Sequence, residues 1–292
     1  MQISLSQIPF NWNHETVTNF YQEIATLPLD TIYIGNTVCS KREATVSIQQ
    51  WLEIAENLQA QGKKVIFSTL ALIETSAELQ QLTKICSEIP FLIEANDIGT
   101  VNILAHNNKR FACGPGINIY NHNSIKVLQE KGMVRWTPPV ELSIDAIAQI
   151  KAATTSFSAT TDLYAFGYLP LAISARCYSA RIEGLDKEHC NNICNKTPYG
   201  HAVDTTDNRD FLRINGTQTM SGAIHNALNG WKAAQTAGID SLRISPANAD
   251  MKQVIEQTYK MLDGEIAAVE INLDPRERFC QGFAFDEAGI EL

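Results

Sequence analysis

The sequence lacks the long apolar segments that membrane proteins require, since no apolar run reaches the roughly 20 residues of a membrane-spanning helix. The first fifteen residues, Met1 to Glu15, also lack a basic stretch followed by an apolar one, which argues against a secretory signal. We therefore expect a chain with no membrane span and a cytoplasmic location, where glutathione keeps thiols reduced.

The sequence also lacks two common hydrolase motifs and an excess of basic residues. No G-x-S-x-G nucleophile turn and no H-E-x-x-H zinc helix occurs, so the commonest serine-hydrolase and metalloprotease centres are not indicated. The chain has 23 Lys and Arg against 32 Asp and Glu, for a formal net charge of -9. This balance argues against a large phosphate-binding surface, and we expect no nucleic-acid partner.

Strand-like and helix-like segments alternate through the first half of the 292-residue chain. Short β-rich runs at Thr31 to Gly35 and Lys64 to Thr69 flank a helical pattern from about Val46 to Gln61. Such βα units, repeated about every 25–30 residues, are typical of a parallel sheet, either a closed barrel or an open doubly wound sheet. We predict one α/β domain over residues 1–292, a parallel (β/α) barrel-like fold.

This rhythm breaks after residue 160. Leu163 to Ile173 has the composition of one strand, and irregular turn-rich sequence follows it to about Arg209. We place a cysteine-bearing, cofactor-binding segment at about residues 168–200. Regular structure returns with helices predicted at about 224–237 and 251–263, and the tail from Phe279 is expected to be a surface extension.

Three of the seven cysteines lie within this irregular segment, at Cys177, Cys190 and Cys194. Seven thiols cannot all pair, and clustered cysteines in a reducing compartment favour metal binding over disulfides. If Cys190 to Cys194 is a helical turn, both thiols project from one face. The spacing is neither the paired C-x-x-C of zinc ribbons nor the dense run of bacterial ferredoxins, so it indicates an irregular metal or iron–sulfur site.

A fourth ligand would have to come from elsewhere in the chain. Cys39 follows the strand Thr31 to Gly35, at the strand end that carries the site in βα barrels, and Cys113 has the same position after another strand. Cys280 lies in the tail. Cys86 falls on an apolar helical stripe and is expected to be core. The residues alone leave Cys39, Cys113 and Cys280 open.

The segment from Arg176 to Cys194, with the preceding Tyr168-Leu-Pro-Leu-Ala-Ile-Ser174, resembles the cysteine motif of peptidase family U32. Chain length and the set Cys39, Cys177, Cys190 and Cys194 are most similar to the smaller member of the U32 pair that acts in oxygen-independent ubiquinone biosynthesis. The resemblance implies that these four cysteines bind a [4Fe–4S] cluster.

The same resemblance implies partners. The chain would form a heterodimer with UbiU and act with the lipid-binding protein UbiT, with prephenate as oxygen donor and the ubiquinone precursor as the molecule hydroxylated. It would be a subunit of an anaerobic hydroxylase complex and not a working peptidase. Two alternatives are a U32-type factor that hydroxylates a nucleotide in RNA and a structural zinc protein that scaffolds a partner.

Other polar residues near the cysteines are weaker candidates. Arg176 and Arg181 would either neutralise an acidic ligand or solvate a loop. His189 would either act on the cluster or lie on the surface. Further candidates are two rings that pack near the site and two turns suited to a ligand: Tyr168, Tyr178, the stretch Asn215 to Thr219 and the stretch Gly114 to Gly116.

Overall fold

The computed structural model describes residues 1–291, and its centre is a closed barrel of parallel strands. Each strand pairs with the next along the chain from β1 to β7, and β13 then pairs with both β7 and β1, which closes the cylinder. The barrel strands are β1 (Gln2–Leu5), β2 (Thr31–Gly35), β3 (Lys64–Ser68), β4 (Leu92–Ala95), β5 (Phe111–Cys113), β6 (Met133–Trp136), β7 (Thr160–Gly167) and β13 (Ser241–Ile244).

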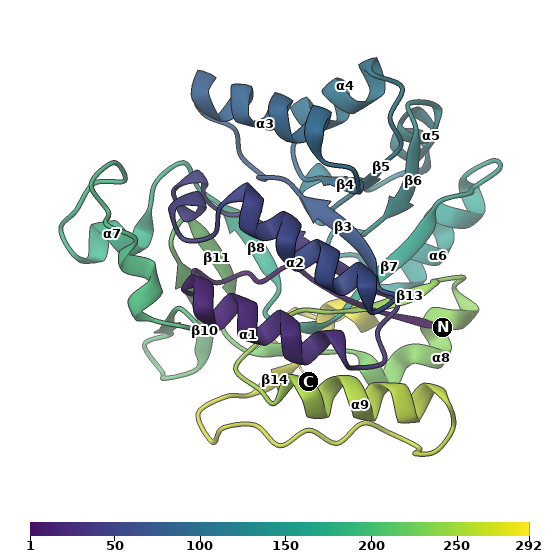
Figure 1. The fold of residues 1–292 in the computed structure, drawn as a ribbon. Coiled ribbons are helices and arrows are strands. Elements are labelled where there is room, and N and C mark those ends of the chain that lie inside the picture. Colours follow the sequence, from purple (N-terminus) through teal and green to yellow (C-terminus); the bar gives the residue numbers. More distant parts are fainter. Residues whose placement is uncertain (292) are drawn as a thin grey trace.

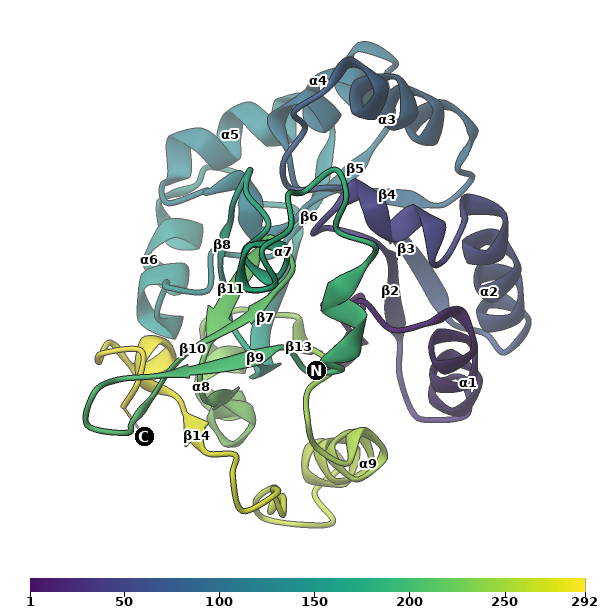
Figure 2. The same ribbon diagram turned by 90° about the vertical axis from the view of Figure 1, so that its left-hand side faces the viewer.

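Helices surround this barrel in a ring, as Figure 2 shows in an end-on view. They are α1 (His14–Ala25), α2 (Ile48–Ala60), α3 (Ser76–Glu88), α4 (Ile98–His106), α5 (His122–Glu130), α6 (Ile144–Ala153), α8 (Trp231–Thr236) and α9 (Met251–Leu262). Side-chain caps start all of these helices except α8, and Ser47 with Gln50 and Thr75 with Glu78 form reciprocal capping boxes on α2 and α3. The predicted parallel (β/α) barrel is confirmed, with helices packed against closed strands.

The irregular segment is an insertion between β7 and the last barrel strand. It contains a four-stranded antiparallel sheet in the order β8-β11-β10-β9 and a short helix. Figures 1 and 2 show this insertion projecting from one side of the barrel and lying across its end. Its elements are β8 (Pro170–Ile173), α7 (Tyr178–Ile182), β9 (His201–Asp204), β10 (Asp210–Asn215) and β11 (Gln218–Ser221).

The run from Leu163 to Ile173 is two strands in different sheets and not one. The chain turns between them at Gly167, which has φ +117°, a conformation that side chains rarely adopt. A Cβ there would lie 2.7 Å from the Cβ of Ser245, so β7 and the segment after β13 approach too closely for any larger residue. This glycine lets the chain leave the barrel and enter the inserted sheet.

Two other expectations fail near the end of the chain. The helix predicted over 224–237 begins as a strand, β12 (Ile224–Asn226), which pairs antiparallel with β7, and only Trp231–Thr236 is helical. The tail is not a surface extension, because β14 (Phe279–Cys280) pairs with β12 and Cys280 is buried. Both segments are short buried strands whose partners are distant in sequence, so local periodicity does not reveal them.

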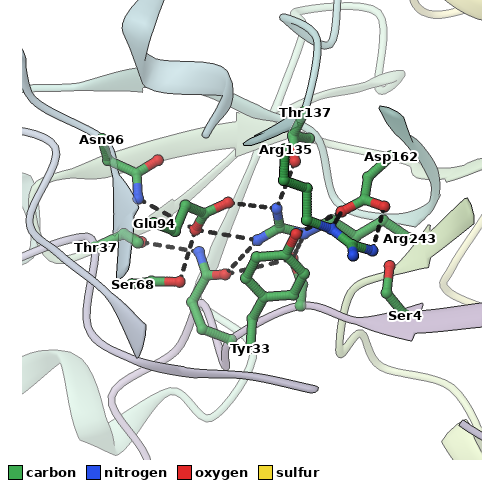
Figure 3. Close-up of polar contacts among 12 residues, drawn as sticks. Ser4, Tyr33, Thr37, Ser68, Glu94, Asn96, Arg135, Thr137, Asp162 and Arg243 are labelled. Atoms are coloured by element: carbon green, nitrogen blue, oxygen red, sulfur yellow. Dashed lines mark hydrogen bonds and ion pairs between the residues drawn. The ribbon is translucent and has the colours of Figure 1, made fainter. Parts of the chain in front are cut away.

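Charged residues fill part of the barrel interior (Figure 3). Arg243 on β13 reaches across to Glu94 on β4, with 2.5 Å between Nη1 and Oε1, and both side chains are almost wholly buried. Ser68 also donates a hydrogen bond of 2.6 Å to Glu94. Burial alone would raise the pKa of Glu94, but the guanidinium of Arg243 and these hydrogen bonds hold it below its usual range.

A second buried pair lies beside the first (Figure 3). Arg135 on β6 donates to both oxygens of Asp162 on β7, at 2.7 and 2.6 Å, and Tyr33 donates to the same carboxylate. The ring of Tyr33 lies 3.6 Å below the guanidinium carbon of Arg243 and so joins the two pairs. The barrel core is therefore held by two buried charge pairs from four strands, with the hydroxyls of Tyr33 on β2 and Ser68 on β3 as further hydrogen-bond donors.

We predict that Glu94→Gln destabilises the fold by about 3–5 kcal/mol, because it leaves the buried charge of Arg243 unpaired. Replacing both residues by Met should cost less than the sum of the single changes. Because the pKa of Glu94 lies below its ordinary 4.5, this stabilisation is complete above that pH and is lost as the pH falls toward the lower folded value. Chemical denaturation followed by tryptophan fluorescence measures each change.

The matched control is Asp274→Asn, which breaks the exposed pair of Asp274 with Arg276. It should change the free energy of unfolding by less than about 1 kcal/mol. A Glu94→Gln protein as stable as this control would contradict the assignment.

Candidate functional site

The four cysteines of the predicted site lie at the carboxyl end of the barrel strands. Cys39 is in the loop after β2, and Cys177, Cys190 and Cys194 are in the insertion that follows β7. The last three are buried, whereas Cys39 is partly exposed. Since parallel strands all end at the same rim, loops from distant parts of the sequence meet there.

The four thiols are close enough to act on one another electrostatically. Burial raises the pKa of Cys177 above its ordinary value, and the thiolates of Cys194, Cys39 and Cys190 raise it further, against a hydrogen bond from the amide of Ala180. Burial also raises the pKa of Cys39, with Arg42 and Lys187 opposing it and Cys194 adding to it. Cys39 and the three cysteines of the insertion, which are distant in sequence, therefore share one local electrostatic environment.

The remaining cysteines are outside this group. Burial raises the pKa of Cys86 on α3 to about 11, that of Cys113 on β5 to about 12 and that of Cys280 on β14 to about 11, and no thiol of the four contributes to these shifts. Cys86 is core, as expected. Of the three candidates for a fourth position, Cys39 alone lies beside the clustered cysteines.

The arrangement of Cys190 and Cys194 does not follow the helical case that was considered from the sequence. The stretch from Cys190 to Cys194 is not a helical turn, because Asn191 and Asn192 between them have φ of +47° and +53°, in the left-handed region. Asparagine tolerates that region better than most residues. The two thiols are therefore set by this reversal of the chain and by a short 3-10 helix, Ile193–Lys196, that carries Cys194.

A buried asparagine connects the loop that carries Cys39 with the segment that carries Cys194. The side-chain nitrogen of Asn215, at the end of β10, donates to the carbonyl of Cys194 at 3.0 Å and to that of Thr197 at 3.3 Å. Its oxygen accepts from Arg42 at 2.7 Å and from the backbone N–H of Asn11 at 3.3 Å. One side chain thus connects the loops after β1 and β2 with the insertion.

Arg42 is the cation of this group, and it is buried. Besides Asn215 it donates to the carbonyl of Pro9 at 2.9 Å, while its Nε is buried without a hydrogen-bond partner. Burial lowers the pKa of Arg42, and the thiolates of Cys194, Cys39 and Cys177 act in the opposite direction. Arg42 therefore offsets negative charge that collects on the sulfurs.

Two N–H groups also point at sulfur. The amide of Asn11 donates to the Sγ of Cys194 at 3.3 Å, and the backbone N–H of Ala180 donates to the Sγ of Cys177 at 3.4 Å. Such hydrogen bonds stabilise thiolates and tune the reduction potential of iron–sulfur centres. Sequence reasoning missed Asn11 and Arg42, and took Asn215 only as a turn, because polar loop residues carry no periodic signal.

The turn from Asn215 to Thr219 has a structural role and does not present a free backbone to a ligand. The N–H of Gly216 donates to the hydroxyl of Ser179, and its carbonyl accepts from Tyr178. Gly216 has φ +72° and lies against Cys194 and Arg42, so glycine suits the position. The hydroxyl of Thr217 donates to the carbonyl of Val38, next to Cys39. The turn therefore connects both halves of the site.

The other candidate residues near the cysteines lie on the surface or in the core and not at the cysteine site. Arg176 and Arg181 are exposed, with no ion pair among residues 1–291, and His189 pairs with Asp186 on the surface. Tyr168 is core and donates to Glu277, but Tyr178 is exposed, so its expected packing role is wrong. In the stretch Gly114 to Gly116, the N–H of Gly114 donates to the carbonyl of Ala95 and is therefore engaged within the barrel.

The chemistry of the donor set suits a thiolate-bound cofactor. The site has four cysteine sulfurs, with a buried arginine and two N–H donors close to them. Across the described residues, no three His, Cys, Asp or Glu side chains are placed to hold a single metal ion, so cluster ligation stays a prediction.

Comparison with known proteins places the chain in a family. The model of peptidase family U32 matches residues 13–277, nearly the whole sequence. The chain belongs to peptidase family U32. Similar solved structures include dihydropteroate synthase (FolP) from Thermus thermophilus, with 10% identity, a TM-score of 0.41 and coverage of 84% of this chain and 88% of that one.

A second similar solved structure is an uncharacterized B. cereus protein, with 12% identity, a TM-score of 0.38 and coverage of 88% of this chain and 64% of that one.

None of the helices in residues 1–291 is long and apolar enough to cross a membrane.

We predict that Asn215→Ala loosens the segment around Cys194, because four hydrogen bonds to buried groups are lost, at about 1–3 kcal/mol for each group left unsatisfied. Amide hydrogen exchange should rise over residues 190–200. Thr219→Ala is the control, since it lies in the adjacent strand and its side chain makes no hydrogen bond within the described residues. Equal exchange in the two variants would show that Asn215 does not hold the site.

Proposed function

We propose that Cys39, Cys177, Cys190 and Cys194 bind one [4Fe–4S] cluster. The observation that carries this proposal is the convergence of four thiols from the loops after β2 and β7, three of which, Cys39, Cys177 and Cys194, lie near the buried Arg42. Four thiolates are the usual ligands of such a cluster. When bound, the cluster would supply electron transfer or redox chemistry at the barrel mouth.

The protein residues would tune that centre. Arg42 offsets the negative charge of the thiolates, and Asn11 and Ala180 donate hydrogen bonds to sulfur. Charge, hydrogen bonds to sulfur and solvent exposure are the factors that set the potential of a cluster. Cys39 is the most exposed of the four cysteines that would hold the cluster.

We further propose that the chain acts as UbiV, in oxygen-independent ubiquinone biosynthesis. This finer assignment rests on family membership, on chain length and on the spacing of the four cysteines. In this role it would pair with UbiU, act with UbiT, and support hydroxylation of the ubiquinone precursor with prephenate as oxygen donor. A cytoplasmic location remains part of the same proposal.

The ligand set can be tested by single substitutions. Alanine at any of the four positions Cys39, Cys177, Cys190 and Cys194 should sharply lower bound iron and sulfide after anaerobic purification. Alanine at Cys86, Cys113 or Cys280, which lie elsewhere in the fold, should not. Iron and acid-labile sulfide assays measure the result, and circular dichroism confirms folding.

Two outcomes would contradict the ligand assignment. Near-normal iron in the Cys39→Ala protein would remove Cys39 from the set. A colourless protein with one zinc per chain would favour the structural zinc alternative, since zinc also accepts four thiolates.

The partnership is tested by reconstitution. The chain should co-elute with UbiU, and a Cys177→Ala protein should abolish anaerobic ubiquinone formation while aerobic synthesis continues. The reason is that cofactor chemistry performs the difficult step while the protein positions the reactants. A cluster-free variant that keeps anaerobic synthesis, or salt-dependent RNA binding that accompanies RNA hydroxylation, would overturn the assignment.

A further inference from the structure

A cavity of about 720 Å³ lies beside the cysteine site. Its walls come from the loop after β2, from β3 and α3, and from the cysteine-bearing insertion, which contributes Ala175, Lys187 and Glu188. Ser40 and Lys41, the two residues after Cys39, also line it. The volume is that of a typical small-molecule site. Any occupant would lie between the barrel wall and the loop that carries Cys39.

One side of the cavity is apolar. Trp51 from α2, Phe67 from β3, and Leu82 and Ile85 from α3 form this wall. Trp51 is fixed there by an edge-on contact with the ring of Tyr21, 5.9 Å between centroids. Large rigid side chains around a preformed space favour a flat apolar ligand, because little ordering is needed on binding.

The other side is acidic. Both lysines of the rim are already paired, Lys41 with Glu188 at 2.8 Å and Lys187 with Glu74. Glu78 is also engaged, since it accepts from Ser40 at 2.6 Å and caps α3. The rim therefore offers no free cation within the described chain, and an anionic ligand would meet carboxylates.

Glu43 is the polar group that remains. It lines the cavity and is half-buried, and among residues 1–291 its carboxyl has no hydrogen-bond or ion-pair partner. Burial, with a smaller effect of Glu78, raises the pKa of Glu43. A half-buried carboxyl without a partner gains most from a ligand that donates a hydrogen bond.

We propose that this cavity binds a neutral aromatic molecule that carries a hydroxyl group, with its ring against Trp51 and Phe67 and its hydroxyl donated to Glu43. The role of such a molecule as the ring that is hydroxylated rests on the proposed function, whereas the binding itself does not. The same geometry disfavours the binding of a dianionic acid such as prephenate in this cavity.

The experiment uses the anaerobically purified protein and two ligands with the same ring, 2-naphthol and 2-naphthoate, in ligand-observed NMR titrations. We expect 2-naphthol to bind at least about tenfold more tightly, because the carboxylate would be buried beside carboxylates. Glu43→Gln should weaken 2-naphthol binding about tenfold, since the charged acceptor of the hydrogen bond is lost.

A matched pair of variants locates the binding. Ala77 and Gln80 are both exposed on α3, but only Ala77 lines the cavity. Ala77→Trp should fill the entrance and abolish binding, whereas Gln80→Trp should leave it unchanged. Neither position is in the core, so both variants should fold.

Three results would overturn the proposal: 2-naphthoate binding as tightly as 2-naphthol, unchanged binding in Ala77→Trp, or no binding of 2-naphthol to the native chain. Iron content and co-elution with UbiU, measured on the same preparations, distinguish a failure of the cavity proposal from a failure of the proposed function. Loss of naphthol binding with a normal cluster would reject the cavity alone, and naphthol binding without iron would reject the cluster alone.

Discussion

The buried pair of Arg243 and Glu94 is the contact on which the rest of the molecule depends. It spans the barrel from β13 to β4, and its desolvation is offset only by close geometry and by neighbouring hydroxyl and amide groups. Arg243 also donates to Gln7 at 2.8 Å, and Gln7 donates to Thr37 at 3.2 Å. Thr37 and Val38 precede Cys39, and Thr217 then bonds to Val38. Polar contacts therefore continue from the barrel centre to the cysteine loops.

This continuity explains how a site made of loops keeps its shape. Loops seldom hold groups precisely unless the scaffold fixes them. Here the loop after β2 is held from below by Gln7 and from above by Asn215 and Thr217. The insertion is in turn attached to the barrel by Trp12, which donates to the carbonyl of Pro198 at 2.7 Å. These attachments fix the short helices that carry or follow Cys177 and Cys194, and through them the thiols.

Much of the barrel could be predicted from sequence, because its helices and strands have local periodicity: Thr31–Gly35 matches its predicted bounds, and Lys64–Ser68 and Met251–Leu262 match theirs to within one residue. The site could be predicted only in part. The three clustered cysteines are evident from their spacing, but the preference for Cys39 over Cys113 and Cys280 came from a family resemblance, and only the fold separates them physically. Asn11, Arg42 and Asn215 meet through contacts that span up to 204 residues, which no local pattern encodes.

The position of the insertion determines when the site can form during synthesis. Cys39 and Arg42 emerge early, yet their partner Asn215 follows 173 residues after Arg42. Chains grow at about 5–20 residues per second, so these early groups wait on the order of ten seconds or more for the insertion to appear. Loading of any cofactor into this site is therefore a late event of biogenesis, and a chain that stops before β10 has all four thiols but lacks Asn215, which connects their loops.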